Sequence, residues 1–335
     1  MTYKIGILDQ SPIFPNRTAQ DALKSTVELA QKAESWGYHR FWVAEHHQSE
    51  DVAGASPEIL MSHLLAQTNK IKIGAGGVML QHYSPYKVAE NFHVMEALAP
   101  ERVELGIGKA PGGLNASTAA LRYGGTGNDT SFEERFTLLQ QFLSGNIPED
   151  HALSEAVVHP KIARTLPTFL LGASVNSARF AARLGANFVF ASFLNGDETL
   201  LEETMKAYRA LHPHGKFIIA VAAFVGTDQQ AAEEEADKYN IYKVTFESGR
   251  ALSVVSLDQV EALWRQTNEP FEVHEQKVQK IAGTQKHVKE EFGRLARTFD
   301  VDEFIVHTPV LDEAKRLQSF ELLSVLNKQY VYKIM

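Results

Sequence analysis

Eight short apolar runs that alternate with segments of helical periodicity constrain the fold of this 335-residue chain most strongly. Strands that alternate with helices in this way imply parallel strands joined by right-handed crossovers. Eight such units suit a closed (β/α)8 TIM barrel, so we predict an α/β fold with one barrel domain over residues 1–335. An open doubly wound sheet is the alternative, because one sequence gives an uncertain strand count.

The expected strands are residues 4–8, 41–44, 71–80, 102–108, 168–172, 187–191, 216–225 and 303–307. The expected helices are residues 18–36, 58–68, 85–98, 132–143, 176–184, 198–211, 229–242, 284–298 and 312–328. Residues 145–165 and 245–273 lack comparable periodicity. We interpret these two stretches as insertions into the single domain and not as linkers between domains.

Composition excludes several classes of partner. The net charge of -8, with no basic cluster to override it, argues against a nucleic-acid partner. The absence of cysteine excludes disulfides and cysteine-ligated metals. The chain enters a strand-like run at once, without a signal peptide, and no run approaches the 18 or so apolar residues that span a membrane. These features predict a soluble, cytoplasmic protein.

One expected strand, residues 41–44, ends abruptly at Glu45, His46 and His47. α/β enzymes place their chemistry at this carboxyl edge of the sheet. The alternative is that these polar residues only solvate a loop. Adjacent histidines on an extended segment point to opposite sides, and the spacing HExxH is absent, so we predict no metal site.

Two glycine motifs resemble nucleotide-binding sequences without meeting their requirements. Residues 74–77 (GAGG) fall inside an expected strand, and the third glycine of a dinucleotide fingerprint is missing. Gly108 and Lys109 suggest a phosphate-binding loop, but Ala110 replaces the hydroxyl residue that would hold magnesium. We therefore assign neither motif a nucleotide.

Residues 172–179 (GASVNSAR) join an expected strand to an expected helix and suit an anion. The hydroxyls of Ser174 and Ser177, with the free N–H groups at the helix N-terminus, are the components of a phosphate site. Lys109, which ends another expected strand, could supply a positive charge to the same anion. The alternative is that Ser174 only caps the helix.

Sequence segments in a fixed order carry a resemblance to a known family. They are LDQSP at 8–12, AEHHQ at 44–48, IGAGGVMLQHYSPYKVAE at 73–90, ELGIGKAPGG at 104–113, LLGASVNSARFAARLGANFVFASF at 170–193, and AGT…DEFIVHT near the carboxyl end. Through them almost the whole chain resembles the bacterial-luciferase-like family of flavin-dependent monooxygenases, which are (β/α)8 barrels. LDQSP and GKAPGG suggest the stand-alone branch of that family more than its light-emitting enzymes.

The resemblance implies reduced FMN at the carboxyl ends of the strands, supplied by a separate NAD(P)H-flavin reductase. Molecular oxygen (O2) then forms a peroxyflavin that oxidises a small organic substrate. His46 matches the family's catalytic histidine, and a neutral imidazole can move a proton near neutral pH. Gly76 and Gly77 match a non-proline cis peptide that faces the flavin ring. Lys109, Ser174 and Ser177 match the phosphate-binding positions.

Three departures from the light-emitting enzymes concern activity and not flavin binding. Lys109 stands where those enzymes usually have arginine. A lysine ammonium is a compact charge and lacks the planar guanidinium that can bind an anion through two parallel hydrogen bonds. Ala173 stands where they have glutamate, and Gly108 where they have a reactive cysteine. The departures argue against light emission from long-chain aldehydes.

Residues near other strand ends are candidates for the substrate side of the site, with core packing as the alternative. They are Gln10, Phe190, Ser192 and Phe193. The irregular stretches 112–131, 145–165 and 245–273 would build the rest of the pocket, because barrel enzymes vary most in such loops. The family is often homodimeric, and apolar residues at 59–65 offer an interface stripe, although the same pattern serves a barrel's own core.

Other functions remain open from sequence. A deazaflavin in place of FMN would give a hydride-transfer oxidoreductase. A third possibility is a non-catalytic flavin-binding barrel, against which His46 argues. A flavin-free hydrolase or aldolase would need Glu45 or Lys109 as its acid, base or Schiff-base residue.

Overall fold

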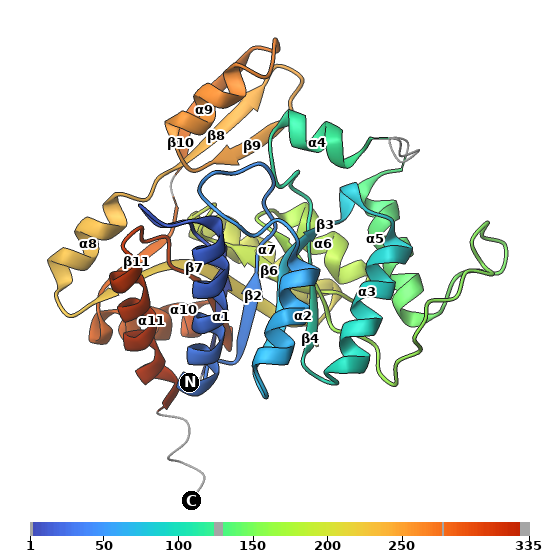
Figure 1. The fold of residues 1–335 in the computed structure, drawn as a ribbon, viewed down its shortest axis with the longest axis horizontal. Helices are drawn as coiled ribbons and strands as arrows, with labels where there is room; N and C mark the ends of the chain where they lie inside the picture. The colour runs from blue at the N-terminus through green and yellow to red at the C-terminus, as the bar shows by residue number, and fades with distance from the viewer. Residues whose placement is uncertain (1–2, 124–129, 277, 329–335) are drawn as a thin grey trace, which may run out of the picture.

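The computed structural model describes residues 3–123, 130–276 and 278–328. Eight parallel strands form a closed barrel at its centre (Figure 1), which confirms the predicted (β/α)8 fold. They are β1 (Lys4–Asp9), β2 (Arg40–Val43), β3 (Lys72–Met79), β4 (Val103–Gly108), β5 (Thr168–Gly172), β6 (Asn187–Ala191), β7 (Phe217–Gly226) and β12 (Glu303–His307). The barrel closes because β12 pairs with both β7 and β1.

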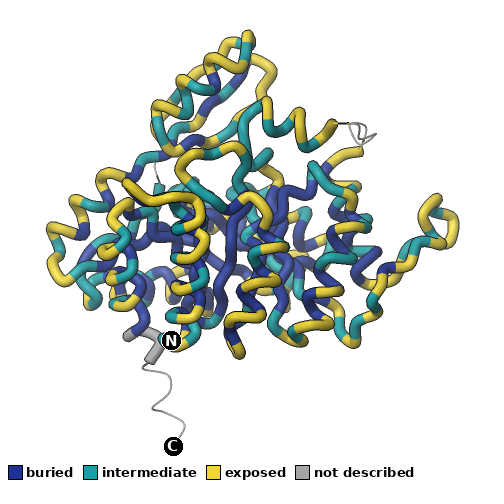
Figure 2. The backbone as a smooth tube through the Cα atoms, in the orientation of Figure 1, coloured by how far each residue is buried: buried dark blue, intermediate teal, exposed yellow. Residues whose placement is uncertain are grey.

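Helices surround the barrel and follow its strands in the chain. They are α1 (Ala19–Trp36), α2 (Pro57–Gln67), α3 (Pro85–Leu98), α5 (Phe132–Ser144), α6 (Val175–Arg183), α7 (Glu198–Leu211), α10 (Gln285–Thr298) and α11 (Glu313–Lys328). Figure 2 shows the strands buried at the centre and exposed residues on the outer sides of the helices. In the described ranges, no helix is both long and apolar enough to cross a membrane.

Helix ends follow the local sequence. At the start of α1, Thr18 and Asp21 form a capping box, in which each side chain accepts a hydrogen bond from the other residue's backbone N–H. The helix ends at Gly37, whose φ of 81° is left-handed and easy only for glycine. The predicted span of this helix, residues 18–36, is confirmed to within one residue.

Alternate residues of each strand belong to two separate apolar clusters. On β7, Ile219 and Val221 pack in the cluster between the strands and the helices. Ile218 and Ala220 pack in a second cluster that includes Trp42 and fills the barrel interior. This is the expected consequence of the two-residue period of a strand, and it determines which strand residues can reach the barrel mouth.

A buried ion cluster occupies the interior at the amino ends of the strands. Arg40 donates from Nε to Oε1 of Glu303 at 2.5 Å and from Nη1 to Oε2 of Glu104 at 2.6 Å. The Trp42 indole donates to the same Glu104 oxygen at 2.8 Å. All these side chains are almost fully buried. Each carboxylate therefore depends on its partners to offset the free-energy cost of removing its charge from water. The opposite, carboxyl ends of the strands are left to form the mouth.

The chain between β7 and α10 differs from the prediction. The expected helix 229–242 is too long: α8 spans Gln229–Asp237, and β8 begins at Ile241. β8 (Ile241–Phe246) buries Ile241, Val244 and Phe246, and it is a strand because it pairs antiparallel with β9 (Ala251–Val254) and β10 (Phe271–Gln276). The expected irregular stretch 245–273 contains β9, α9 (Leu257–Trp264) and the start of β10. The three strands form an antiparallel sheet above the barrel in Figure 1.

Two further elements were not predicted. β11 (Lys280–Thr284) pairs with residues 222–226 of β7, because β7 has ten residues and continues beyond its pairing with β6. α4 (Asn115–Leu121) lies in the stretch 112–131, of which residues 124–129 are outside the described part of the chain. Residues 145–165 form turns without a helix or strand, as predicted.

Candidate active site

His46 lies just beyond β2, at the barrel mouth. Its position continues the inward series of Trp42 and Ala44, which belong to the interior cluster. The imidazole Nδ1 is buried and, within the part of the chain that the structure describes, has no hydrogen-bond partner. Burial, with a smaller effect from His47, lowers the pKa of His46 from 6.5 to about 4. A neutral ring with an unsatisfied nitrogen is suited to bind a ligand atom or to exchange a proton with one.

The neighbouring His47 has a different environment. Its Nε2 lies 2.7 Å from Oε1 of Glu45, a fully buried carboxylate. That carboxylate also accepts hydrogen bonds from the Tyr83 hydroxyl at 2.7 Å and from the Met79 backbone N–H at 2.9 Å. His47 and Glu45 thus join the ends of β2 and β3. The two adjacent histidines differ in environment, as the extended backbone predicts.

The turn after β4 packs directly against the histidine segment. The backbone N–H of His47 donates to the Gly112 carbonyl at 2.7 Å, and that of His46 donates to the Gly54 carbonyl at 2.8 Å. Gly112 has a φ of 68°, and a Cβ there would lie 3.2 Å from Cδ2 of His47. Glycine therefore allows this turn to approach His47 closely.

Gly76 and Gly77 form a stretch of β3 without side chains. The peptide bond between them is cis, as the family resemblance implies. A Cβ on Gly76 would lie 2.7 Å from Cδ1 of Leu8, and one on Gly77 would lie 2.8 Å from the backbone nitrogen of Gly108. Larger residues would disrupt the strand packing at both positions. No side chain projects from these two positions, so their backbone is not covered by side chains of its own.

Lys109 and the start of α6 line one hollow beside β4 and β5. Its lining residues are Lys109, Phe132, Glu133, Leu170, Leu171, Asn176, Ser177 and Phe180. Lys109 and Ser177 are distant in sequence, but the carboxyl ends of parallel neighbours β4 and β5 bring them together. Two of the predicted phosphate-binding residues, Lys109 and Ser177, therefore share one hollow, and the third, Ser174, contacts Ser177 at its side.

The groups around this hollow are already partly engaged with one another. The Lys109 ammonium lies 2.9 Å from Oε1 of Glu133 in an exposed ion pair. The Ser174 hydroxyl accepts from the Ser177 backbone N–H at 3.2 Å, so Ser174 does cap α6. The Ser174 and Ser177 hydroxyl oxygens lie 2.9 Å apart. An anion bound here would compete with Glu133 for the Lys109 ammonium and would accept hydrogen bonds from the serine hydroxyls.

The four candidate substrate residues occupy different positions. Gln10 is half-buried just after β1, and the Phe193 ring packs in the interior cluster beside the mouth. Ser192 is buried, and its carbonyl accepts from the Gln279 backbone N–H at 3.1 Å. Phe190 belongs to the outer cluster between strands and helices. The prediction that Phe190 lines the substrate side is therefore wrong, because its position on β6 turns it away from the barrel interior.

His307, at the end of β12, is an inward-facing residue that the sequence reasoning missed. It is 4% exposed, and its Nδ1 has no hydrogen-bond partner. Its ring packs against Phe193 and Tyr239, with centroid distances of 5.6 and 6.0 Å. Burial, followed by the charge of Arg316, lowers its pKa from 6.5 to about 3. A polar residue that ends an apolar strand is the signal that singled out His46, and it would also have found His307.

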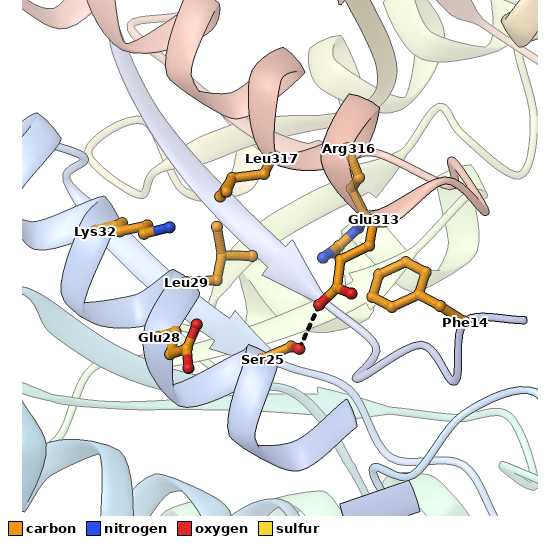
Figure 3. A pocket seen from close by; sticks show the side chains of 8 residues that line it. All are labelled: Phe14, Ser25, Glu28, Leu29, Lys32, Glu313, Arg316 and Leu317. Carbon is orange, nitrogen blue, oxygen red and sulfur yellow. Dashed lines mark hydrogen bonds between the residues drawn. The ribbon is translucent and has the colours of Figure 1, made fainter. Parts of the chain in front are cut away.

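A second hollow lies on the outside of the barrel, between α1 and α11 (Figure 3). Ser25 on α1 donates a hydrogen bond to Glu313 on α11 at 2.6 Å across one side of it. None of the predicted site residues lines this hollow. In the described part of the chain, no three histidine or acidic side chains gather closely enough to hold a metal ion.

Comparisons with known proteins give the family. The model of the luciferase-like monooxygenase family matches residues 3–302. The N-acetyl-S-alkylcysteine monooxygenase of Bacillus subtilis (strain 168) is 43% identical over 324 residues, which cover 96% of this chain and 97% of that protein.

Two solved structures show how far the similarity extends. The crystal structure of apo-MsnO8 is 29% identical and superposes with a TM-score of 0.77 over 98% of both chains. The oxygenating constituent of 3,6-diketocamphane monooxygenase from Pseudomonas putida, in complex with FMN, has the same fold at 16% identity, with a TM-score of 0.69 over 100% of this chain and 99% of that chain. With the family model matched over most of its length, this chain belongs to the luciferase-like monooxygenase family and is a monooxygenase.

Proposed function

We propose that this monooxygenase uses reduced FMN and O2 to oxidise a small organic substrate at the barrel mouth. The observation that carries the proposal is that a set of anion-binding groups, Lys109 with Ser174 and Ser177, follows the carboxyl ends of β4 and β5, at the same edge of the barrel as His46 after β2. The bare backbone of Gly76 and Gly77 between them fits a planar ring. These residues fit a flavin mononucleotide at both its phosphate and its ring.

Each group has a defined task in this proposal. Lys109 and the start of α6 bind the cofactor phosphate, since a helix N-terminus and an ammonium both favour an anion. Reduced FMN supplies two electrons, so that one oxygen atom enters the substrate and the other leaves as water. His46 stays neutral at pH 7 because of its lowered pKa, and its Nδ1 can accept or return a proton during the reaction.

The substrate is proposed to be a small thioether. The Bacillus subtilis relative is named for action on N-acetyl-S-alkylcysteines and aligns with nearly the whole chain. The buried rings of Phe193 and Tyr239 offer apolar surface near the mouth that would suit an alkyl or aryl sulfide. A separate NAD(P)H-flavin reductase would supply the reduced cofactor, and the reaction would take place in the cytoplasm.

Labelled oxygen tests this function. Purified protein is supplied with chemically reduced FMN, ¹⁸O2 and N-acetyl-S-benzylcysteine, and the products are analysed by mass spectrometry. We expect one ¹⁸O atom in the organic product, dependent on reduced FMN. Turnover with a reduced deazaflavin but not with FMN would contradict the proposal and favour hydride transfer. Flavin binding without any product would favour the non-catalytic alternative.

We further propose a single-domain chain that works as a homodimer, for which α2 offers limited support. Met61, Leu64 and Leu65 of the predicted stripe are buried against the barrel, whereas Ile59 is 73% exposed. Most of that stripe therefore serves the protein's own core. Light scattering of the purified protein would give the mass in solution, and an Ile59→Asp variant that becomes monomeric would implicate this face.

A further inference from the structure

β11 presents Lys280 to the barrel mouth. Lys280 pairs with Ala222 of β7, and residues directly opposite one another on paired strands point to the same face. Ala222 belongs to the interior cluster, and Ala282, two residues after Lys280, packs against that cluster. The intervening Ile281 belongs to the outer cluster. The side chain of Lys280 therefore extends from the inner face.

His307 lies at the same level on the other side of β7. It pairs with the same residue, Ala222, across the β7–β12 ladder. Lys280 and His307 thus flank one small alanine, with Cα atoms about 10 Å apart from the spacing of adjacent strands. On the intervening strand β7, the residue at this level is Ala222, whose side chain is a single methyl group.

Both flanking residues have unused binding capacity. Lys280 is half-buried, and in the ranges that the structure describes it forms no ion pair with a carboxylate. His307 is almost fully buried, and its Nδ1 has no hydrogen-bond partner among the described residues. A partly desolvated cation without a counter-charge favours an anion, and an unsatisfied buried imidazole nitrogen favours a hydrogen-bond partner.

We propose that Lys280 and His307 form the subsite for the polar end of the substrate, in which Lys280 binds a carboxylate and His307 Nδ1 accepts a hydrogen bond from a neighbouring N–H. This deepens the proposed function and rests on it for the reaction, but not for binding. The matching class is a small N-acylated amino acid with an apolar sulfur substituent, which Phe193 and Tyr239 would contact. This subsite is built on β7, β11 and β12, whereas the Lys109 hollow is built on β4, β5 and α6, so we assign the two cations to different anions.

The test compares two ligands that differ only in charge, N-acetyl-S-benzylcysteine and its carboxamide. Calorimetric titration of the full chain, saturated with FMN, measures both dissociation constants without turnover. We expect the wild type to bind the acid at least about tenfold more tightly than the amide, since a hydrogen bond to a charged group has that order of effect. Lys280→Met should remove this preference while leaving amide binding unchanged.

Three controls separate the outcomes. Lys280→Arg should retain most of the preference because it keeps the charge, and Lys286→Met, at an exposed position on α10, should behave as wild type. An unchanged acid affinity in Lys280→Met, equal binding of acid and amide by the wild type, or no binding of either would overturn the inference. Weakened FMN binding in Lys280→Met would also overturn it, by assigning Lys280 to the cofactor. A failure of oxygen incorporation alone would count against the proposed reaction and not against this subsite.

Discussion

At the scale of single residues, burial keeps three histidines of the barrel uncharged. It is the main cause of the lowered pKa of His39 and His307, each to about 3, and of His46, to about 4. The unfolded chain would protonate these residues near pH 6.5. Between that value and the folded pKa the unfolded state binds more protons, so stability is complete above pH 6.5 and falls as the pH decreases toward 4.

The pH dependence gives the first prediction. Each such histidine contributes at most about 1.4 kcal/mol of lost unfolding free energy per pH unit over that interval. His307→Asn should therefore lose less stability than the wild type between pH 7 and pH 5, as measured by urea denaturation at both values. His274→Asn, which replaces a histidine whose side chain is 69% exposed, is the matched control and should follow the wild type. Equal losses in wild type and His307→Asn would contradict the assignment.

At the scale of elements, we expect the turn after β4 and the start of α6 to bind the FMN phosphate together. The Lys109–Glu133 ion pair is exposed, so its loss should cost less than about 1 kcal/mol of stability. Lys109→Met should nevertheless weaken reduced FMN binding about tenfold or more. Riboflavin, which lacks the phosphate, should bind wild type and variant equally in an anaerobic fluorescence titration.

Another exposed lysine controls for charge removal alone. Lys87 pairs with Glu90 on α3 at 3.1 Å, and its side chain is 65% exposed. Lys87→Met should leave both affinities unchanged. If Lys109→Met weakened the binding of riboflavin and of FMN to the same extent, the FMN phosphate would have to bind elsewhere.

How far sequence predicts structure also differs from element to element. The eight barrel strands could be predicted because each is a short, mainly apolar run between helical segments. The proximity of Lys109 and Ser177 followed from the rule that parallel strands end at one edge. β11 could not be predicted, because its sequence KIAGT is short and mixed and its pairing depends on the length of β7. Phe190 was misassigned because a five-residue strand such as β6 does not reveal which face is buried against helices.

At the scale of the whole molecule, the two ends of the barrel have separate roles. The amino end is closed by Arg40, Glu104 and Glu303, which are buried and mutually paired. Among the described residues, the carboxyl end contains two buried polar atoms without a hydrogen-bond partner, the Nδ1 atoms of His46 and His307, and the amino end has one on His39. Groups that satisfy one another stabilise a fold, whereas unsatisfied groups at a mouth are available to a ligand.

Removing the buried cation should therefore affect folding and not ligand recognition. Arg40→Met leaves two buried carboxylates without their main partner, and we expect a loss of about 3–5 kcal/mol in unfolding free energy. Urea denaturation at pH 7 measures this loss. Arg17→Met removes an exposed pair with Glu313 at 3.1 Å and should cost less than about 1 kcal/mol. A comparable cost for both variants would refute the structural role of the cluster.

We propose that reduced FMN binds at the mouth beside His46 and reacts there with O2. Rapid mixing of an anaerobic solution of protein and reduced FMN with oxygenated buffer, followed by absorbance, tests this proposal. We expect a transient absorbance that precedes the spectrum of oxidised flavin and decays at a different rate in His46→Ala. Failure to bind reduced FMN, or a direct return to oxidised flavin at the rate of the free cofactor, would contradict it.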